Sequence, residues 1–387
     1  MKTRRQLLAL AAAIAFAVPL AQAQSDTVKI GVLLPMTGPQ ASTGKQIDAA
    51  IKLWVAQNGN KVAGKTVQVI VKDDGGVADQ ARRLAQELVV NDKVVALAGF
   101  GLTPIALAIA PIATQSKTPM VVMAAATSAI TEASPYVVRT SFTLPQAAVA
   151  MGEWATKNGI KKVVTLVADY GPGNDAEKFF ADRILLNGGQ VAEKLRTPLR
   201  SPDFAPVLQK ARDAKPDAVF VFLPSGQGAQ FMKQFAERGL DKAGIKLIAT
   251  GDVTDDDQLN DMGDVALGVV NAHHYSAHHQ SPANKKFVDA FQAANKFRPN
   301  FMAVGGYDGM RVIYKALEAS KGAGGDALLN AMKGQIFESP RGPVLIDAQT
   351  RDIVHDMYIR KVERKDGQLW NVEFDAIKQM KDPGKAK

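Results

Sequence analysis

Short apolar runs alternate with amphipathic helical patterns along most of the chain, and this alternation limits the possible fold more than any other feature. Val28–Leu34 is an apolar run of strand length, and Gln46–Gln57 then places apolar residues at helical spacing. The same pair of signals recurs as far as Ile245–Ala249. Short apolar strands that are each followed by an amphipathic helix are typical of parallel sheets covered on both faces. The sequence therefore predicts an α/β fold with mainly parallel sheets.

The strand signals are too numerous for one open sheet, so we expect two sheets of about five strands each. Three places interrupt the alternation and mark predicted seams between two lobes: Ser141–Pro145, Val269–Ser276 and Gly342–Asp347. None of these seams carries a flexible linker, which favours lobes joined by several short crossings. We predict one lobe from residues 24–142 and 276–344, and a second from residues 143–275 and 345–375.

The C-terminal part of the sequence has a different pattern. Met357–Phe374 alternates apolar and polar residues around Asp366-Gly367, which is typical of a β-hairpin. Residues 376–387 are predicted to form a tail, which is basic and frayed from Lys378 onward.

The first residues have the three parts of an export signal. Lys2, Arg4 and Arg5 form a basic front, Leu7–Leu20 is apolar, and Ala21-Gln22-Ala23 is a small-x-small cleavage site. The alternative, a retained anchor, is disfavoured because the apolar stretch is shorter than the roughly 20 residues that a membrane span needs. We therefore predict a cleaved signal peptide over residues 1–23 and an exported protein. The Arg-Arg pair leaves general and twin-arginine secretion both open.

Composition excludes several classes of function. The chain has no cysteine, which rules out disulfides, thiol catalysis, cysteine-ligated metals and a lipid-modified N-terminal cysteine. The formal net charge is +9, but basic and acidic residues are interspersed along most of the predicted helices. This pattern indicates a solvated surface and not a nucleic-acid-binding stripe.

Enzyme motifs are weak in this sequence. There is no Gly-x-Ser-x-Gly motif and no Walker loop. The segment Gly171–Ala176 formally matches the Gly-x-Gly-x-x-Ala dinucleotide fingerprint. However, Pro172 removes a backbone N–H that a pyrophosphate would need, and Asp169 brings a negative charge close by. We interpret this segment as a turn that opens a helix.

Two clusters of polar residues could suggest metal binding. His273, His274, His278 and His279 lie close together, but no carboxylate lies among them, so we predict a loop or hinge rich in polar rings and no metal site. Asp255-Asp256-Asp257 lacks the spacing of a calcium loop. We predict that one of these aspartates caps the helix that follows.

Binding is better supported than catalysis. Four predicted strand ends carry small or hydroxylated residues and are each followed by a helix, at Thr37–Gly44, Gly99–Pro104, Ala124–Ser128 and Asp169–Asn174. Helix N-termini offer unpaired N–H groups and a positive dipole end, and Thr103 and Thr127 add hydroxyls there. Such an edge can hold a carboxylate without arginine or lysine. The alternative is that each threonine is an ordinary N-cap.

The chain closely resembles the branched-chain amino acid (Leu/Ile/Val-binding) group of periplasmic solute-binding proteins of ABC transporters, which have the type I periplasmic binding fold. The resemblance covers essentially the whole chain after the signal. Its motifs are Ile30–Pro39, Asp73-Asp74, Val94–Gly99 leading to Thr103, Ala124–Thr127, Tyr136–Arg139, Asp169–Gly171, Gly305–Asp308 and Ser339–Gly342. The resemblance implies two Rossmann-like α/β lobes joined by three crossings, which close on a small-molecule solute. It also implies a periplasmic monomer without catalysis or cofactor, whose partner is an inner-membrane ABC permease.

The resemblance also implies roles for individual residues. In this group, a hydroxyl at the position of Thr103, the backbone around Ala125 and the side chain of Thr127 hold the ligand carboxylate. A residue at the position of Tyr170 closes over the ligand, and a carboxylate at that of Asp252 holds the α-amine. The predicted ligand-binding residues are thus Thr43, Thr103, Ala125, Thr127, Tyr170 and Asp252.

Two departures from the pattern affect the predicted ligand. Thr43 stands where amino acid binders often have tyrosine, and Asp252 stands where they often have glutamate. An aromatic carboxylate without an amine therefore remains an alternative to a branched-chain or related amino acid. A second alternative is a periplasmic sensor partner in place of a transport component.

Overall fold

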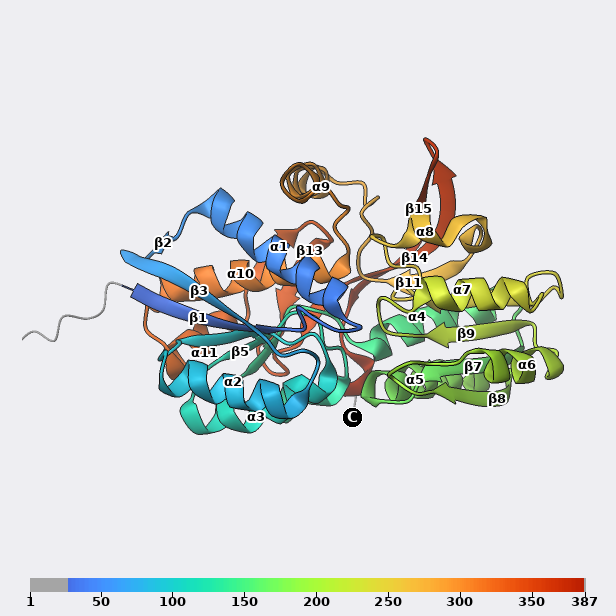
Figure 1. Ribbon diagram of the computed structural model, residues 1–387, viewed down its shortest axis with the longest axis horizontal. Coiled ribbons are helices and arrows are strands. Elements are labelled where there is room, and N and C mark those ends of the chain that lie inside the picture. Colours follow the sequence, from blue (N-terminus) through green and yellow to red (C-terminus); the bar gives the residue numbers. More distant parts are fainter. Residues whose placement is uncertain (1–26, 386–387) are drawn as a thin grey trace, which may run out of the picture.

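The computed structural model describes residues 27–385, and in it two α/β units lie side by side (Figure 1). The predicted signal peptide, residues 1–23, lies outside the described residues. Within them, no helix is long and apolar enough to cross a membrane. The two predicted sheets are present, with six and nine strands.

The first lobe, as we call the unit built on the six-stranded sheet, has the strand order β2-β3-β1-β4-β5-β6. All neighbours are parallel except β2 and β3. The strands are β1 (Thr27–Leu34), β2 (Lys61–Val62), β3 (Lys65–Asp73), β4 (Ala96–Gly99), β5 (Met120–Val122) and β6 (Val137–Arg139). Its early helices are α1 (Ala41–Asn58), α2 (Ala78–Val90), α3 (Thr103–Ser116) and the 3₁₀ helix η1 (Ser128–Glu132).

Helices from later in the chain complete the first lobe. α10 packs along α1, and the two helices lie on the opposite side of the sheet from α2 and α3 (Figure 1). These later helices are α9 (Pro282–Asn295), α10 (Phe301–Ala319) and α11 (Gly325–Met332).

The second lobe is built on the nine-stranded sheet, in which β8-β7-β9-β10-β11 are parallel and the rest antiparallel. The parallel strands are β7 (Lys162–Ala168), β8 (Gln190–Thr197), β9 (Ala218–Phe222), β10 (Lys246–Thr250) and β11 (Val270–His273). The antiparallel strands are β12 (Ile336–Ser339), β13 (Gly342–Ile346), β14 (Ile353–Lys365) and β15 (Gln368–Met380). The helices are α4 (Leu144–Lys157), α5 (Gly171–Leu186), α6 (Ala205–Asp213), α7 (Gly228–Glu237), α8 (Leu259–Met262) and the 3₁₀ helix η2 (Gly263–Ala266).

Buried β-branched and aromatic side chains hold helices and sheets together. Every residue of β9 is buried, and the ring of Phe220 stacks on that of Phe180 from α5 at a centroid distance of 3.9 Å. Each such strand sits between helices on both faces, so it needs apolar residues on both sides. This is why the continuous apolar runs of the sequence become central parallel strands.

The chain passes between the lobes three times, after β6, after β11 and after α11. The predicted lobe boundaries remain a prediction, and the sheets do not follow them everywhere, because β12 and β13 pair into the larger sheet through β14. The predicted hairpin around Asp366 is confirmed as β14 and β15.

The prediction of a frayed tail is wrong for its described part. β15 continues to Met380, and a 3₁₀ helix, η3 (Pro383–Lys385), follows it. Asp382 is buried and accepts hydrogen bonds from the hydroxyls of Ser128, at 2.5 Å, and Thr143, at 3.0 Å. A buried carboxylate with two donors fixes the segment despite its basic composition.

Candidate functional site

A cavity lies between the two lobes, where the carboxyl ends of the parallel strands of both sheets meet. The empty space between its walls, including space open to solvent, is about 390 Å³. In each sheet the strand order reverses at one point, between β1 and β4 in the first and between β7 and β9 in the second. Loops after these four strands line the cavity, as expected for ligand sites of open α/β sheets.

Five of the six predicted ligand-binding residues line this cavity. The first lobe contributes Thr43, Thr103 and Ala125, and the second lobe contributes Tyr170 and Asp252. The sixth, Thr127, does not line the cavity. It contacts Thr103, which does, and the two hydroxyl oxygens are 2.9 Å apart. The fold thus brings together residues that are far apart in the sequence.

The two threonines are not ordinary N-caps. Leu102 occupies the N-cap position of α3, and Thr127, which occupies that of η1, makes no side-chain hydrogen bond to the helix. Instead the two hydroxyls bond to each other in a buried position. Each hydroxyl has one proton to donate and two acceptor sites, so their mutual bond uses only one of the two protons. The second proton has no acceptor among the described residues.

Helix starts surround the threonine pair. α3 begins at Thr103, and α5 begins at Gly171, as predicted for the Gly171–Ala176 segment. A Cβ atom added to Gly171 would lie 2.7 Å from the Thr127 hydroxyl, so α5 approaches the first lobe closely only because this residue is glycine. The unpaired N–H groups of such helix starts favour an anion at this end of the cavity.

Among the described residues, Asp252 is the only charged side chain that lines the cavity. It is 5 % exposed, and its Oδ2 atom has no hydrogen-bond partner in the described part of the chain. The nearest ring nitrogen, Nε2 of His273, is 3.6 Å away. Burial lowers the pKa of His273 to about 4, although the Asp252 carboxylate acts in the opposite direction. A buried carboxylate without donors is costly, so this group needs a donor from a ligand.

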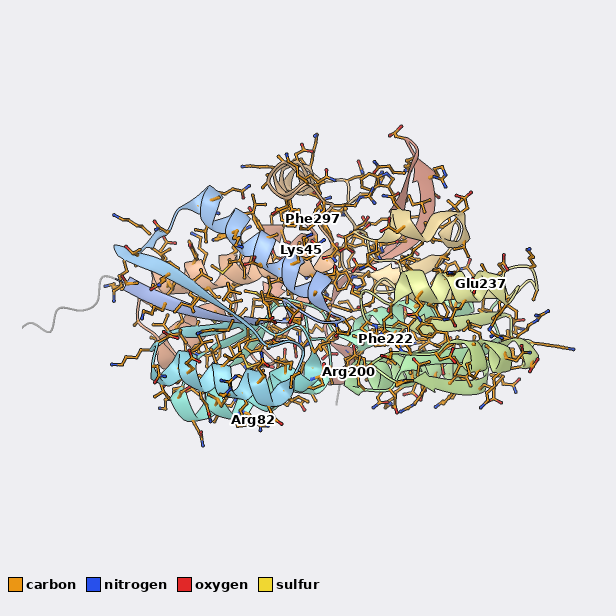
Figure 2. All side chains as sticks on the ribbon, viewed as in Figure 1. Lys45, Arg82, Arg200, Phe222, Glu237 and Phe297 are labelled. Carbon is orange, nitrogen blue, oxygen red and sulfur yellow. The ribbon has the colours of Figure 1, made fainter. Side chains whose placement is uncertain are left out.

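The rest of the wall is mostly apolar and aromatic, and sequence reasoning missed it. Its further members include Phe142, Leu144, Phe222, Pro224, Ser225 and Met302. Figure 2 shows Phe222 at the junction between the lobes. Phe222 ends an apolar strand and Met302 begins a helix, so the sequence patterns alone make both look like ordinary core residues. The hydroxyl of Tyr170 is buried, which raises its pKa, and the Asp252 carboxylate adds to the increase.

The histidine cluster divides into two parts. His273 and His274 are fully buried and stack with Phe142, Phe301 and His355 behind the cavity. His279 instead bonds to Glu373 at 2.8 Å. β11 ends at His273, just before the second crossing. The predicted loop or hinge role of this pair stays a prediction. His355, which the sequence analysis did not connect with the cluster, comes from β14.

The prediction that an aspartate of 255–257 caps the next helix is wrong. Gln258 occupies the N-cap position of α8, with no side-chain cap. The three aspartates are buried or half-buried between the lobes and accept hydrogen bonds from other segments. Asp257, for example, accepts one from Ser42 of the first lobe at 2.7 Å. Tertiary partners therefore replace the local role that the sequence suggested.

Other polar contacts also join the lobes around the cavity. The backbone N–H of Ser128 donates to Asp175 on α5 at 2.9 Å, and Arg200 donates to the carbonyl of Gly76 at 3.0 Å. Arg200 lies beside the junction in Figure 2. With the cavity walled by both lobes, the structure is that of the closed arrangement.

The comparisons with known proteins agree with this architecture. Residues 27–368 match the periplasmic binding protein family. The Leu/Ile/Val-binding protein homolog 6 of Brucella abortus (strain 2308) is 44% identical over 97% of this chain and 98% of its own length.

Two solved structures are also similar. One is a solute binding protein of an ABC transporter from Rhodopseudomonas palustris BisB5 in complex with 3,4-dihydroxybenzoic acid. It has a TM-score of 0.92 and 61% identity, covering 94% of this chain and all of that chain. Another, an R. palustris solute binding protein in complex with 4-hydroxybenzoate, has a TM-score of 0.90 and 42% identity, covering 93% and 99%. By its matched sequence and its two α/β lobes, this chain belongs to the periplasmic binding protein family.

Proposed function

We propose that this chain is the periplasmic solute-binding component of an ABC importer and that its solute is a hydroxylated aromatic carboxylate. The observation that carries the proposal is the Asp252 carboxylate, which faces an aromatic cavity without a donor of its own. A ring hydroxyl supplies such a donor. The relatives that bind dihydroxy- and hydroxybenzoate support this choice of solute.

The two ends of such a solute match the two lobes. The carboxylate would lie at the starts of α3 and α5, where the bonded pair of Thr103 and Thr127 offers one free hydroxyl proton. The flat ring would fill the space among Phe142, Phe222 and the other apolar side chains of the wall. The ring hydroxyl would donate to Asp252 from the second lobe.

Binding would then work through closure of the lobes. A solute that contacts both lobes is held more tightly in the closed than in the open arrangement, so it shifts the population toward closure. The permease in the inner membrane would receive the closed form. We propose that the chain acts as a monomer and without catalysis. Among the described residues, the one serine of the wall, Ser225, donates to Asp255 and makes no hydrogen bond to a histidine.

Calorimetry on refolded, ligand-stripped protein tests the proposal. We expect 4-hydroxybenzoate to bind at least 100-fold more tightly than benzoate, because benzoate leaves the Asp252 carboxylate unpaired. Asp252→Ala should remove most of this difference. Asp79→Ala is the matched control, because Asp79 is an exposed carboxylate on α2.

Branched-chain amino acids decide between the two candidate solute classes. Tight binding of leucine, isoleucine or valine, with no binding of hydroxybenzoates, would contradict the proposal and return Asp252 to the role of amine partner. Turnover of any of these compounds by the purified protein would contradict its non-catalytic part.

A further inference from the structure

We infer that Ser225 is a specificity-determining residue, which accepts a hydrogen bond from a second ring hydroxyl beside the one that Asp252 accepts. The site then favours aromatic carboxylates with two adjacent hydroxyls. This inference rests on the proposed function and deepens it.

Ser225 and Asp252 follow neighbouring strands of the second lobe. β9 and β10 are parallel, and Val221 pairs with Ala249. Ser225 lies three residues after β9 ends at Phe222, and Asp252 lies two residues after β10 ends at Thr250. Neighbouring strands of a sheet lie about 4.8 Å apart, so the loops that follow them bring Ser225 and Asp252 to the same cavity. Both residues line the cavity.

The hydrogen bonds of Ser225 make it an acceptor. Its hydroxyl donates to Oδ2 of Asp255, and the Nδ2 group of Asn300 donates to the same oxygen at 3.0 Å. Ser225 and Asp255 are 3 % and 2 % exposed, so water does not compete for this bond. A serine whose proton is committed can only accept from a ligand. A ring hydroxyl can donate to it, whereas a ring hydrogen or a methoxy group cannot.

The acceptor role of Ser225 belongs to the ionised form of Asp255. Burial raises the pKa of Asp255 well above its usual value, and the neighbouring Asp257 adds to the increase. The hydrogen bonds that Ser225 and Asn300 donate to Oδ2 favour the carboxylate instead. With Asp255 ionised, Ser225 presents lone pairs to the cavity.

Asn300 connects this arrangement to lobe closure. It caps α10 of the first lobe, with Oδ1 accepting from the backbone N–H groups of Met302, at 2.9 Å, and Ala303, at 3.2 Å. The same side chain reaches Asp255 of the second lobe. In this arrangement, Asn300 of the first lobe therefore shares the acceptor oxygen of the Ser225 hydroxyl.

The test is a ratio of dissociation constants within one protein, which changes in stability do not affect. In the wild type we expect 3,4-dihydroxybenzoate to bind about tenfold more tightly than 4-hydroxybenzoate, the worth of one hydrogen bond. In Ser225→Ala the ratio should fall to about one, and in Ser225→Thr it should persist. Ser42→Ala is the matched control, because Ser42 also donates to an interlobe aspartate but does not line the cavity.

A second measurement keeps the inference testable if Ser225→Ala does not fold. The wild type should bind 4-hydroxy-3-methoxybenzoate more weakly than the dihydroxy compound, since methoxy cannot donate. Equal binding of these two, or an unchanged ratio in Ser225→Ala, would overturn the inference while leaving the proposed function intact. If neither hydroxybenzoate binds at all, the proposed function itself fails.

Discussion

The ring of His273 lies behind the cavity wall with both nitrogens unpartnered, and this has a consequence for acid stability. Its pKa of about 4 in the folded protein compares with about 6.5 in an unfolded chain. Between these values the unfolded chain binds a proton that the folded protein does not. This histidine therefore makes stability fall as the pH drops from about 6.5 to 4, by about 3 kcal/mol in total.

We expect His273→Gln to flatten this part of the pH profile. The free energy of unfolding, measured by urea titration from pH 7 to pH 4.5, should depend less steeply on pH in the variant, by up to about 1.4 kcal/mol per pH unit. His278→Gln is the control, because this histidine is only partly buried and should change the slope less. An unchanged slope in His273→Gln would mean that the ring has the same pKa in the folded and the unfolded protein.

Tyr170 should matter for binding more than for folding. Its ring stacks on Phe222 at a centroid distance of 6.0 Å, and the residue is only half-buried. We expect Tyr170→Ala to weaken solute binding about tenfold or more, through lost contact with the ring, and to lower the free energy of unfolding by about 1 kcal/mol or less. Calorimetry and urea titration measure the two effects. An unfolded variant would instead place Tyr170 in the structural core.

At this scale the sequence predicted the polar end of the site better than the apolar end. Thr103 and Thr127 stand out because several strand ends with small or hydroxylated residues precede helices in this sequence and because both match a family pattern. Phe142 and Phe222 do not stand out, because an aromatic residue at a strand end is equally expected in a core. For Asp255 the sequence suggested a local role as a helix cap. Its actual partners, Ser225 and Asn300, are distant in sequence and leave no local pattern.

At the scale of elements, the start of α5 controls how far the lobes can close. Gly171→Ala would place a methyl group 2.7 Å from the Thr127 hydroxyl in the closed arrangement. The backbone of Gly171 is not left-handed, so alanine is tolerated when the lobes are open. We expect at least tenfold weaker solute binding with little change in the stability of the solute-free protein, measured by calorimetry and urea titration.

Gly324→Ala is the matched control for this steric effect. A Cβ atom there meets Val95 at 3.4 Å, an ordinary contact within the first lobe. Wild-type affinity in Gly171→Ala would show that the solute binds without the close approach of α5 seen in this structure.

Elements with strong periodicity were predictable, whereas others were not. β9, Ala218–Phe222, coincides with one unbroken apolar run of the sequence, because a fully buried parallel strand needs apolar residues on both faces. α1 begins at Ala41 and not near Gln46, since its first turns carry small and polar residues that lie against the other lobe. β12 and β13 are short and largely defined by pairing with β14, which leaves little trace in the local sequence.

At the scale of the whole molecule, Asp382 of the C-terminal segment accepts hydrogen bonds from Ser128 and Thr143, which lie on either side of the first crossing between the lobes. Deleting residues 381–387 removes Asp382 and leaves the hydroxyls of Ser128 and Thr143 without their acceptor. We expect the free energy of unfolding to fall by about 2 kcal/mol, in urea titrations, because buried donors lose their partner. Asp382→Asn keeps one carbonyl acceptor and should cost less. A deletion without effect would mean that these hydroxyls find other acceptors.

The closed cavity between the lobes also sets a limit on kinetics. Under the proposed function, a solute held between the lobes would leave only when they separate, so its residence time would be at least the lifetime of the closed state. Compounds that differ widely in affinity would then share one upper limit on their dissociation rate. This limit would be the rate at which the lobes open, and it would not depend on the chemistry of the compound. Delivery to the membrane would depend on a partner that forces the two halves apart.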